Sequence, residues 1–173
     1  MNRLQNGQFF PSLDIPAVAG GSIKIPQSLR GSYGVVLIYR GAWCPYCQAQ
    51  LGGFQRASEK LADAGIKVVA LSVDDEATTA GTIEKYRLRF PVGHSADADA
   101  VASLTGAYTN EAPRYLQSTG FLLDPDGRVL KVVEKRKGHI LPVSWSTSDR
   151  PPGRAATGGM RHGRAYQEGR AAE

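Results

Sequence analysis

The chain has 173 residues, of which 42% are hydrophobic and 21% charged, a composition typical of one soluble globular domain. No apolar run reaches the roughly 20 residues that a membrane-spanning helix needs, and residues 1–16 show no secretory signal, so we expect a cytoplasmic protein without a membrane partner. The formal charge of +5 lies entirely at the C-terminal end, because 13 basic residues balance 13 acidic ones through Glu134, whereas 8 basic and 3 acidic residues follow.

Residues 1–33 are rich in Gly, Pro and Ser and predict an N-terminal extension with a short hairpin around Gly20-Gly21. The continuous apolar run at 34–39 is typical of a strand buried on both faces. Apolar residues then recur at spacings of three and four, which predicts a helix to about Ala64. A second apolar run at 66–73 predicts a strand, and the strand–helix–strand order makes the two strands parallel.

Asp74 and Asp75 suit the N-cap of a helix that reaches about Arg89, and the negative charge of Glu76 is favourable near the positive N-terminal end of that helix. We therefore interpret this acidic group as a helix start rather than a metal site. The sequence then predicts a short strand at 90–94 and a short helix at 97–104. Two strands of a hairpin follow at 120–124 and 128–133. The resulting fold class is α/β, a mixed central sheet flanked by helices, with the main domain at 34–134.

The two cysteines, Cys44 and Cys47, are the only ones in the chain and stand three positions apart. A disulfide between them closes too short a loop to stabilise the fold appreciably. Redox chemistry, a zinc site and two inert buried thiols are the remaining interpretations. Zinc needs about four ligands, usually from a second Cys or His pair, and the three histidines are scattered. A C-x-x-C beside a βαβ pattern favours a redox dithiol that requires neither cofactor nor metal.

A thiol reacts as its thiolate, and the position of Cys44 favours an anion. Cys44 lies where a buried strand passes into a helix, so it can take the N-cap position among free backbone N–H groups. Pro45 suits the first helical position, and Cys47 returns to the same face. We expect Cys44 to be an exposed nucleophile and Cys47 to lie behind it as the resolving thiol. Trp43 and Tyr46 are expected to form an apolar rim for substrate.

At this point the sequence resembles a known family. The segment 39–47 (YRGAWCPYC) resembles the active-site signature of a peroxiredoxin-like branch of the alkyl hydroperoxide reductase/thiol-specific antioxidant (redoxin) family, and 121–129 (FLLDPDGRV) resembles its last hairpin. The resemblance spans roughly 7–133. It implies a thioredoxin-like fold and thiol-dependent antioxidant activity, with Cys44 matching the peroxidatic or nucleophilic cysteine and Cys47 the resolving one.

Three positions differ from the family pattern. Leu37 and Gly41 stand where peroxiredoxins carry Pro and Thr or Ser. Ser118 stands where they carry an arginine, and where thioredoxins carry a proline that faces the dithiol. We expect Ser118, Pro45 and Arg40 to contact the substrate together with the apolar rim. Arg40, which adds a positive charge near the thiolate, and Arg114 are the candidates to replace that arginine. Tyr108 and Tyr115 lie in a stretch expected to pass near the site, where they could line a groove or simply pack.

The leading hypothesis is a thiol peroxidase or general dithiol oxidoreductase that takes peroxide or disulfide and is recycled by thioredoxin or glutathione. The alternatives are a disulfide reductase without peroxidase activity and a non-enzymatic module whose basic tail binds nucleic acid. Residues 135–173 predict that tail, rich in Arg and Gly, without periodicity and disordered. It lacks interleaved aromatics and a regular repeat, which argues against nucleic acid as its partner. Out-of-frame translation of a GC-rich gene is a further hypothesis for its composition.

Overall fold

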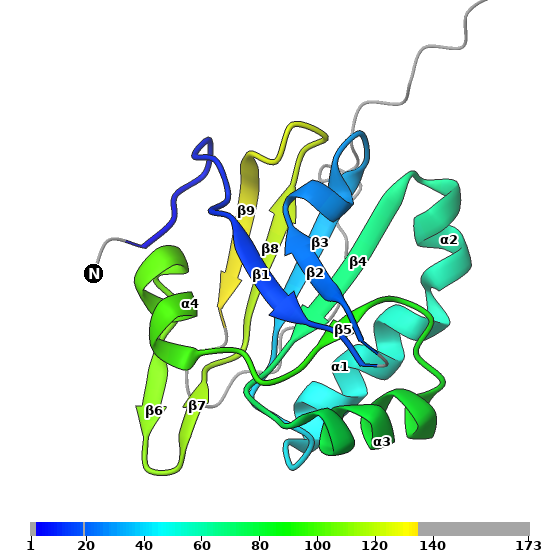
Figure 1. Cartoon of the computed structure of the whole chain (residues 1–173). Coiled ribbons are helices and arrows are strands. Elements are labelled where there is room, and N and C mark those ends of the chain that lie inside the picture. The colour runs from blue at the N-terminus through cyan, green and yellow to red at the C-terminus, as the bar shows by residue number, and fades with distance from the viewer. Residues whose placement is uncertain (1–2, 19, 135–173) are drawn as a thin grey trace, which may run out of the picture. The chain divides into compact units, whose positions relative to one another are not determined.

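A computed structural model describes residues 3–18 and 20–134, and the predicted tail at 135–173 lies outside them. The helices and strands of this part follow the order that the sequence predicts, with one added hairpin, β6–β7 (Figure 1). The elements are β1 Leu13–Pro16, β2 Ser22–Ile25, the short 3-10 helix η1 Gln27–Leu29, β3 Tyr33–Ile38, α1 Pro45–Arg56, α2 Ser58–Asp63, β4 Ile66–Leu71, α3 Glu76–Tyr86, β5 Val92–Gly93, α4 Ala98–Thr105, β6 Thr109–Glu111, β7 Arg114–Leu116, β8 Thr119–Leu123 and β9 Val129–Glu134.

The central sheet has five strands in the order β5-β4-β3-β8-β9. Strand β3 runs parallel to β4, with Val35 opposite Val68, and antiparallel to β8, with Val36 opposite Phe121. The βαβ unit and the mixed sheet predicted from the sequence are therefore confirmed. The β1–β2 and β6–β7 hairpins are separate antiparallel pairs.

Side chains of β3 alternate between two buried clusters, as the two-residue period of a strand requires. Val36 and Ile38 join the cluster that contains the N-terminal hairpin and α4. Val35 and Leu37 join the cluster beneath α1, α2 and α3, and this second cluster also contains both cysteines. The sheet is thus buried on both faces, which explains why the sequence of β3 is apolar without interruption.

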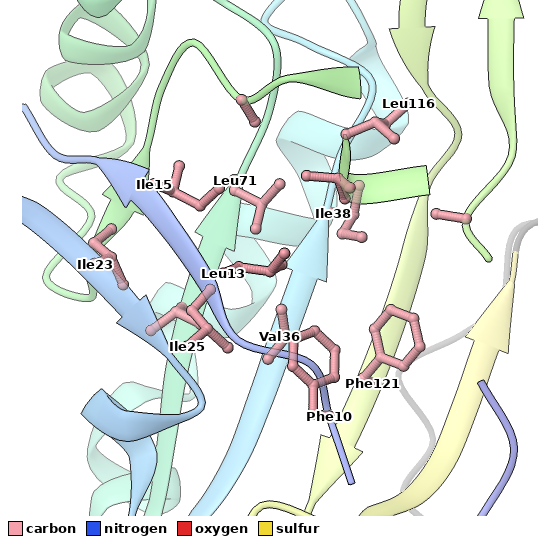
Figure 2. Close-up of a cluster of buried hydrophobic side chains, with 14 of the residues drawn as sticks. Phe10, Leu13, Ile15, Ile23, Ile25, Val36, Ile38, Leu71, Leu116 and Phe121 are labelled. Carbon is pink, nitrogen blue, oxygen red and sulfur yellow. The ribbon is translucent and has the colours of Figure 1, made fainter. Parts of the chain in front are cut away.

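The segment before β3 forms one of these two cores rather than a loose lead-in. Its apolar side chains lie against the sheet in Figure 2: Phe10, Leu13, Ile15, Ile23 and Ile25 against Val36, Ile38, Leu71 and Phe121. The rings of Phe10 and Phe121 meet edge to face, with their centroids 5.2 Å apart. Burying each such side chain contributes about 1.5–3 kcal/mol, so this segment is a substantial part of the folding free energy.

The single helix predicted between Pro45 and Ala64 is wrong in one respect, because the chain forms two helices there. Ala57, with φ −89° and ψ 1°, ends α1 and precedes α2. The apolar spacing continues across the break, since Leu51, Phe54 and Leu61 all enter the same core, and periodicity therefore cannot reveal it. No helix in the described part of the chain combines the length and the apolar character that a bilayer crossing needs.

Candidate active site

The two cysteines lie where β3 passes into α1. Cys44 is the N-cap residue of α1, with extended backbone angles, and Pro45 takes the first helical position, as predicted. The Cys44 sulfur accepts a hydrogen bond from the Cys47 backbone N–H at 3.3 Å. A sulfur at this position meets the free N–H groups and the positive end of the helix, which both stabilise a thiolate.

Both sulfurs are more enclosed than the sequence suggested. The expectation of an exposed Cys44 is wrong, because Cys44 and Cys47 are each only 3% exposed and pack in the core beneath α1. The rim residues are exposed as predicted, Trp43 to 57% and Tyr46 to 56%, and Pro45 is exposed beside them. The first turn of α1 therefore has two sides, with Cys44 and Cys47 facing the core and Pro45 and Tyr46 facing outward.

The environment of Cys47 disfavours its thiolate. Burial raises the pKa of Cys47 from 9.0 to about 12, and the hydrogen-bonded Cys44 side chain adds to the increase. The backbone and the positive charge of Arg40 act in the opposite direction. Cys47 therefore holds its proton at neutral pH, which suits a thiol that reacts only after Cys44 has reacted.

Arg40 and Arg114, the two candidates for the missing arginine, differ in their surroundings. Arg40 is half-buried, its Nε makes no hydrogen bond within the described residues, and its charge acts on Cys47. Arg114 instead forms ion pairs with Asp99 of α4 and with Glu111 across the β6–β7 hairpin. The structure thus brings Arg40 to the dithiol and engages Arg114 elsewhere.

The β6–β7 hairpin, which sequence reasoning missed, contributes one residue to the site. Tyr115 of β7 packs edge to face against Trp43, with ring centroids 5.1 Å apart. Tyr108 takes no part in this contact; its hydroxyl accepts a hydrogen bond from the Arg3 guanidinium, which also lies over its ring. Ser118 is half-buried in the link between β7 and β8, and its predicted contact with substrate stays a prediction.

The helix start predicted after β4 is confirmed for Asp75 and Glu76, whereas Asp74 makes a different contact. Asp75 alone caps α3, where its Oδ1 accepts from the Thr78 backbone N–H at 2.8 Å. Asp74 instead reaches the loop before Cys44 and accepts from the Ala42 N–H at 2.8 Å. Its position after a strand was visible in the sequence, but its partner 32 residues earlier was not.

A second polar residue missed by the sequence lies at the end of β3. Tyr39 is 1% exposed and belongs to the cluster that contains the dithiol. Burial raises the pKa of the Tyr39 phenol, and the nearby Ser72 and Thr79 hydroxyls oppose this effect. Tyr39 and Ser72 follow the adjacent parallel strands β3 and β4, so their common position at the carboxyl edge of the sheet was the available signal.

Known proteins resemble this chain in sequence and in fold. Residues 6–132 match the AhpC/TSA family. The chain is 30% identical over 150 residues to the thiol-disulfide oxidoreductase ResA of Bacillus cereus, covering 82% of this chain and 80% of ResA. It is 23% identical over 152 residues to peroxiredoxin Bcp of Escherichia coli, covering 84% of this chain and 97% of Bcp.

Solved structures agree in fold. Peroxidoxin BcpB from Mycobacterium tuberculosis superposes with a TM-score of 0.69 at 21% identity, over 76% of this chain and 86% of BcpB. AhpC of Enterococcus faecalis superposes with a TM-score of 0.69 at 17% identity, over 82% of this chain and 86% of AhpC. With the family match, the thioredoxin-like sheet and these relatives together, the chain belongs to the AhpC/TSA family and is a peroxiredoxin-like oxidoreductase.

Proposed function

We propose that the chain is a dithiol oxidoreductase in which Cys44 is the nucleophile and Cys47 the resolving thiol. The observation that carries the proposal is the Cys44 sulfur at the N-cap of α1, hydrogen-bonded to the Cys47 N–H at 3.3 Å. This arrangement stabilises a thiolate on the first cysteine and holds the second within one helical turn. The pair can therefore close a disulfide without any change in the fold.

The reaction with a disulfide has two exchange steps. The Cys44 thiolate attacks one sulfur of the substrate, forms a mixed disulfide and expels the other sulfur as a thiolate. Cys47 then loses its proton and attacks the Cys44 sulfur, which closes Cys44–Cys47 and releases the second substrate thiolate. The released thiolates take up protons, so the substrate gains two electrons and two protons overall.

A peroxide is the second candidate substrate, and the burial of Cys44 favours it. Cys44 is only 3% exposed, so a small peroxide reaches it more easily than a disulfide held in a folded protein. The Cys44 thiolate attacks one peroxide oxygen, the O–O bond breaks, and the leaving oxygen takes a proton to form an alcohol or water. Condensation of the resulting sulfenic acid with the Cys47 thiol releases water and closes the same disulfide.

Either cycle ends when an external thiol reduces Cys44–Cys47 with two electrons. We assign this step to thioredoxin or glutathione, which places the cycle in a reducing compartment, the cytoplasm. Trp43 and Tyr46, both more than half exposed, would contact that partner. Fractionation of cells that produce the tagged full chain tests the location.

The test compares wild type, Cys44→Ser and Cys47→Ser in two assays, insulin reduction driven by glutathione and peroxide consumption coupled to a thioredoxin system. We expect wild type to turn over in at least one assay and Cys44→Ser to be inactive in both. Cys47→Ser should react once and retain the substrate fragment on Cys44, detected by mass spectrometry. Turnover by Cys44→Ser equal to wild type, or an inactive wild type with either reductant, would contradict the proposal.

A further inference from the structure

Asp74 connects the end of β4 to the loop that precedes the dithiol. Its Oδ2 atom accepts hydrogen bonds from the Ala42 backbone N–H at 2.8 Å and from the Ser72 hydroxyl at 3.1 Å. The Ser72 oxygen in turn accepts from the Asp74 backbone N–H at 3.2 Å, and Ser72 is fully buried. The Ser72 hydroxyl, from the same loop, therefore orients the Asp74 carboxylate toward Ala42.

The carbonyl of the same peptide bond, which belongs to Gly41, is hydrogen-bonded to the backbone of the nucleophile. The Gly41 carbonyl accepts from the Cys44 N–H at 3.1 Å and from the Gln48 side chain at 3.4 Å. Gly41 has φ +145°, and a Cβ there would lie 2.8 Å from the Asp74 carboxylate and 2.7 Å from the Trp43 indole nitrogen. Several side chains thus meet tightly around one turn, and the turn determines where Cys44 and Trp43 lie.

The neighbouring aspartate shows that this function is separate from starting α3. Asp75 is exposed and caps the helix through Thr78, whereas Asp74 is half-buried and directs its carboxylate to Ala42. The Ala42 and Ser72 bonds of Asp74 both come from neutral donors, a backbone N–H and a hydroxyl. Its function at this place is therefore to accept hydrogen bonds rather than to form an ion pair.

We propose that Asp74 is a positioning residue for the dithiol, which fixes the 41–44 turn and thereby the alignment of Cys44 with Cys47. The inference rests on the proposed function, since alignment matters only if Cys47 attacks a disulfide on Cys44. Intramolecular exchange needs three sulfurs in line, and misplacement by about 1 Å can slow such a step by up to roughly a hundredfold. The bond to Ala42 acts through the turn and does not touch the reacting atoms.

The experiment uses the full chain and 5,5′-dithiobis(2-nitrobenzoate), which reports both exchange steps without a reductase. Cys44 attack releases one coloured thiolate, and Cys47 attack releases the second. Asp74→Asn and Asp74→Ala both remove the charge, but only asparagine keeps a carbonyl oxygen where Oδ2 lies. The difference between the two variants therefore isolates the hydrogen bond. Asp75→Ala is the matched control, one residue away.

We expect the second release to slow at least tenfold in Asp74→Ala and to stay within about threefold of wild type in Asp74→Asn. Asp75→Ala should lower the thermal midpoint and leave the second release unchanged. A wild-type rate in Asp74→Ala, or equal rates in the alanine and asparagine variants, would overturn the inference.

If Asp74→Ala does not fold, Ser72→Ala takes its place, because it removes the two hydrogen bonds between Ser72 and Asp74 that orient the carboxylate and keeps the carboxylate itself. A second release slowed at least threefold supports the inference, and an unchanged one overturns it. Failure of the proposed function is distinct from either result. In that case wild type itself gives no second release, or the single release from Cys44→Ser is as fast as the first release from wild type.

Discussion

The proton held by Cys47 makes a strong prediction about the pH dependence of its attack on the mixed disulfide. Burial and the Cys44 side chain raise the pKa of Cys47 from 9.0 to about 12. At pH 8 a thiol with a pKa of 9.0 is about 10% ionised, whereas one with a pKa of 12 is about 0.01% ionised. In the reduced protein the ionised fraction of Cys47 is therefore roughly a thousandfold smaller than that of a thiol of ordinary pKa, and its attack should be slower, by less than this factor because a more basic thiolate is the stronger nucleophile.

The mixed disulfide lowers this figure but keeps its direction. Once Cys44 is in a disulfide, its thiol no longer raises the pKa of Cys47, while burial, the largest cause, remains. The pKa of Cys47 in the reacting species therefore lies between 9.0 and about 12. Because only the thiolate attacks, the rate should rise about tenfold per pH unit over pH 6–8, and it should keep this slope to pH 9 if the pKa of Cys47 stays well above 9.0.

The assay is the second release of coloured thiolate from 5,5′-dithiobis(2-nitrobenzoate), followed by stopped flow across pH 6–9. Cys47→Ser, which gives only the first release, identifies the two phases. Arg40→Gln removes a charge that lowers the pKa of Cys47, so it should slow the second release at every pH without changing the slope. A second rate that flattens between pH 8 and 9, where a thiol of pKa 9.0 gains only about fivefold in ionisation, would refute the reasoning, because it would reveal an unshifted thiol.

Three further predictions concern stability. Replacing Gly41 by alanine should destabilise the fold by about 1–3 kcal/mol and slow the second release, because its φ is +145° and the new Cβ would meet the Trp43 indole. Gly53→Ala on α1, where a new Cβ makes only an ordinary contact of 3.8 Å with the Arg56 side chain, should instead stabilise the fold by about 0.5–1 kcal/mol. Phe10→Ala, at a residue that is 4% exposed, should lower the free energy of unfolding in urea by about 3–5 kcal/mol. Phe9→Ala, at the neighbouring residue that is 57% exposed, should lower it by less than about 1 kcal/mol. Equal losses would show that the N-terminal segment is not part of the core. Folding raises the pKa of Cys47 from 9.0, so the stability that this thiol contributes is complete below pH 9 and is lost toward pH 12. The free energy of unfolding of wild type should therefore fall relative to that of Cys47→Ala between pH 8 and 10. Parallel curves of stability against pH for the two proteins would contradict this.

Local sequence signals determined the order of the elements and the place of the dithiol. An uninterrupted apolar run is enough to identify β3, because only a strand buried on both faces tolerates it. The proline after Cys44 and the apolar spacing beyond it identify the start of α1, because helix starts are set by a few neighbouring residues. The same locality explains the capping of α3 by Asp75 and of α4 by Asp97.

Only the tertiary structure decided how the dithiol is surrounded. The burial of Cys44, the edge-to-face contact of Tyr115 with Trp43 and the bond from Ala42 to Asp74 join residues that are distant in sequence or buried by distant elements. Such contacts depend on strand register and on which helix covers which face, and neither leaves a period or a cap in the sequence. The sequence by itself therefore determined which atoms react, and the packing of α1 and the β4–α3 loop decided how tightly they are enclosed and held.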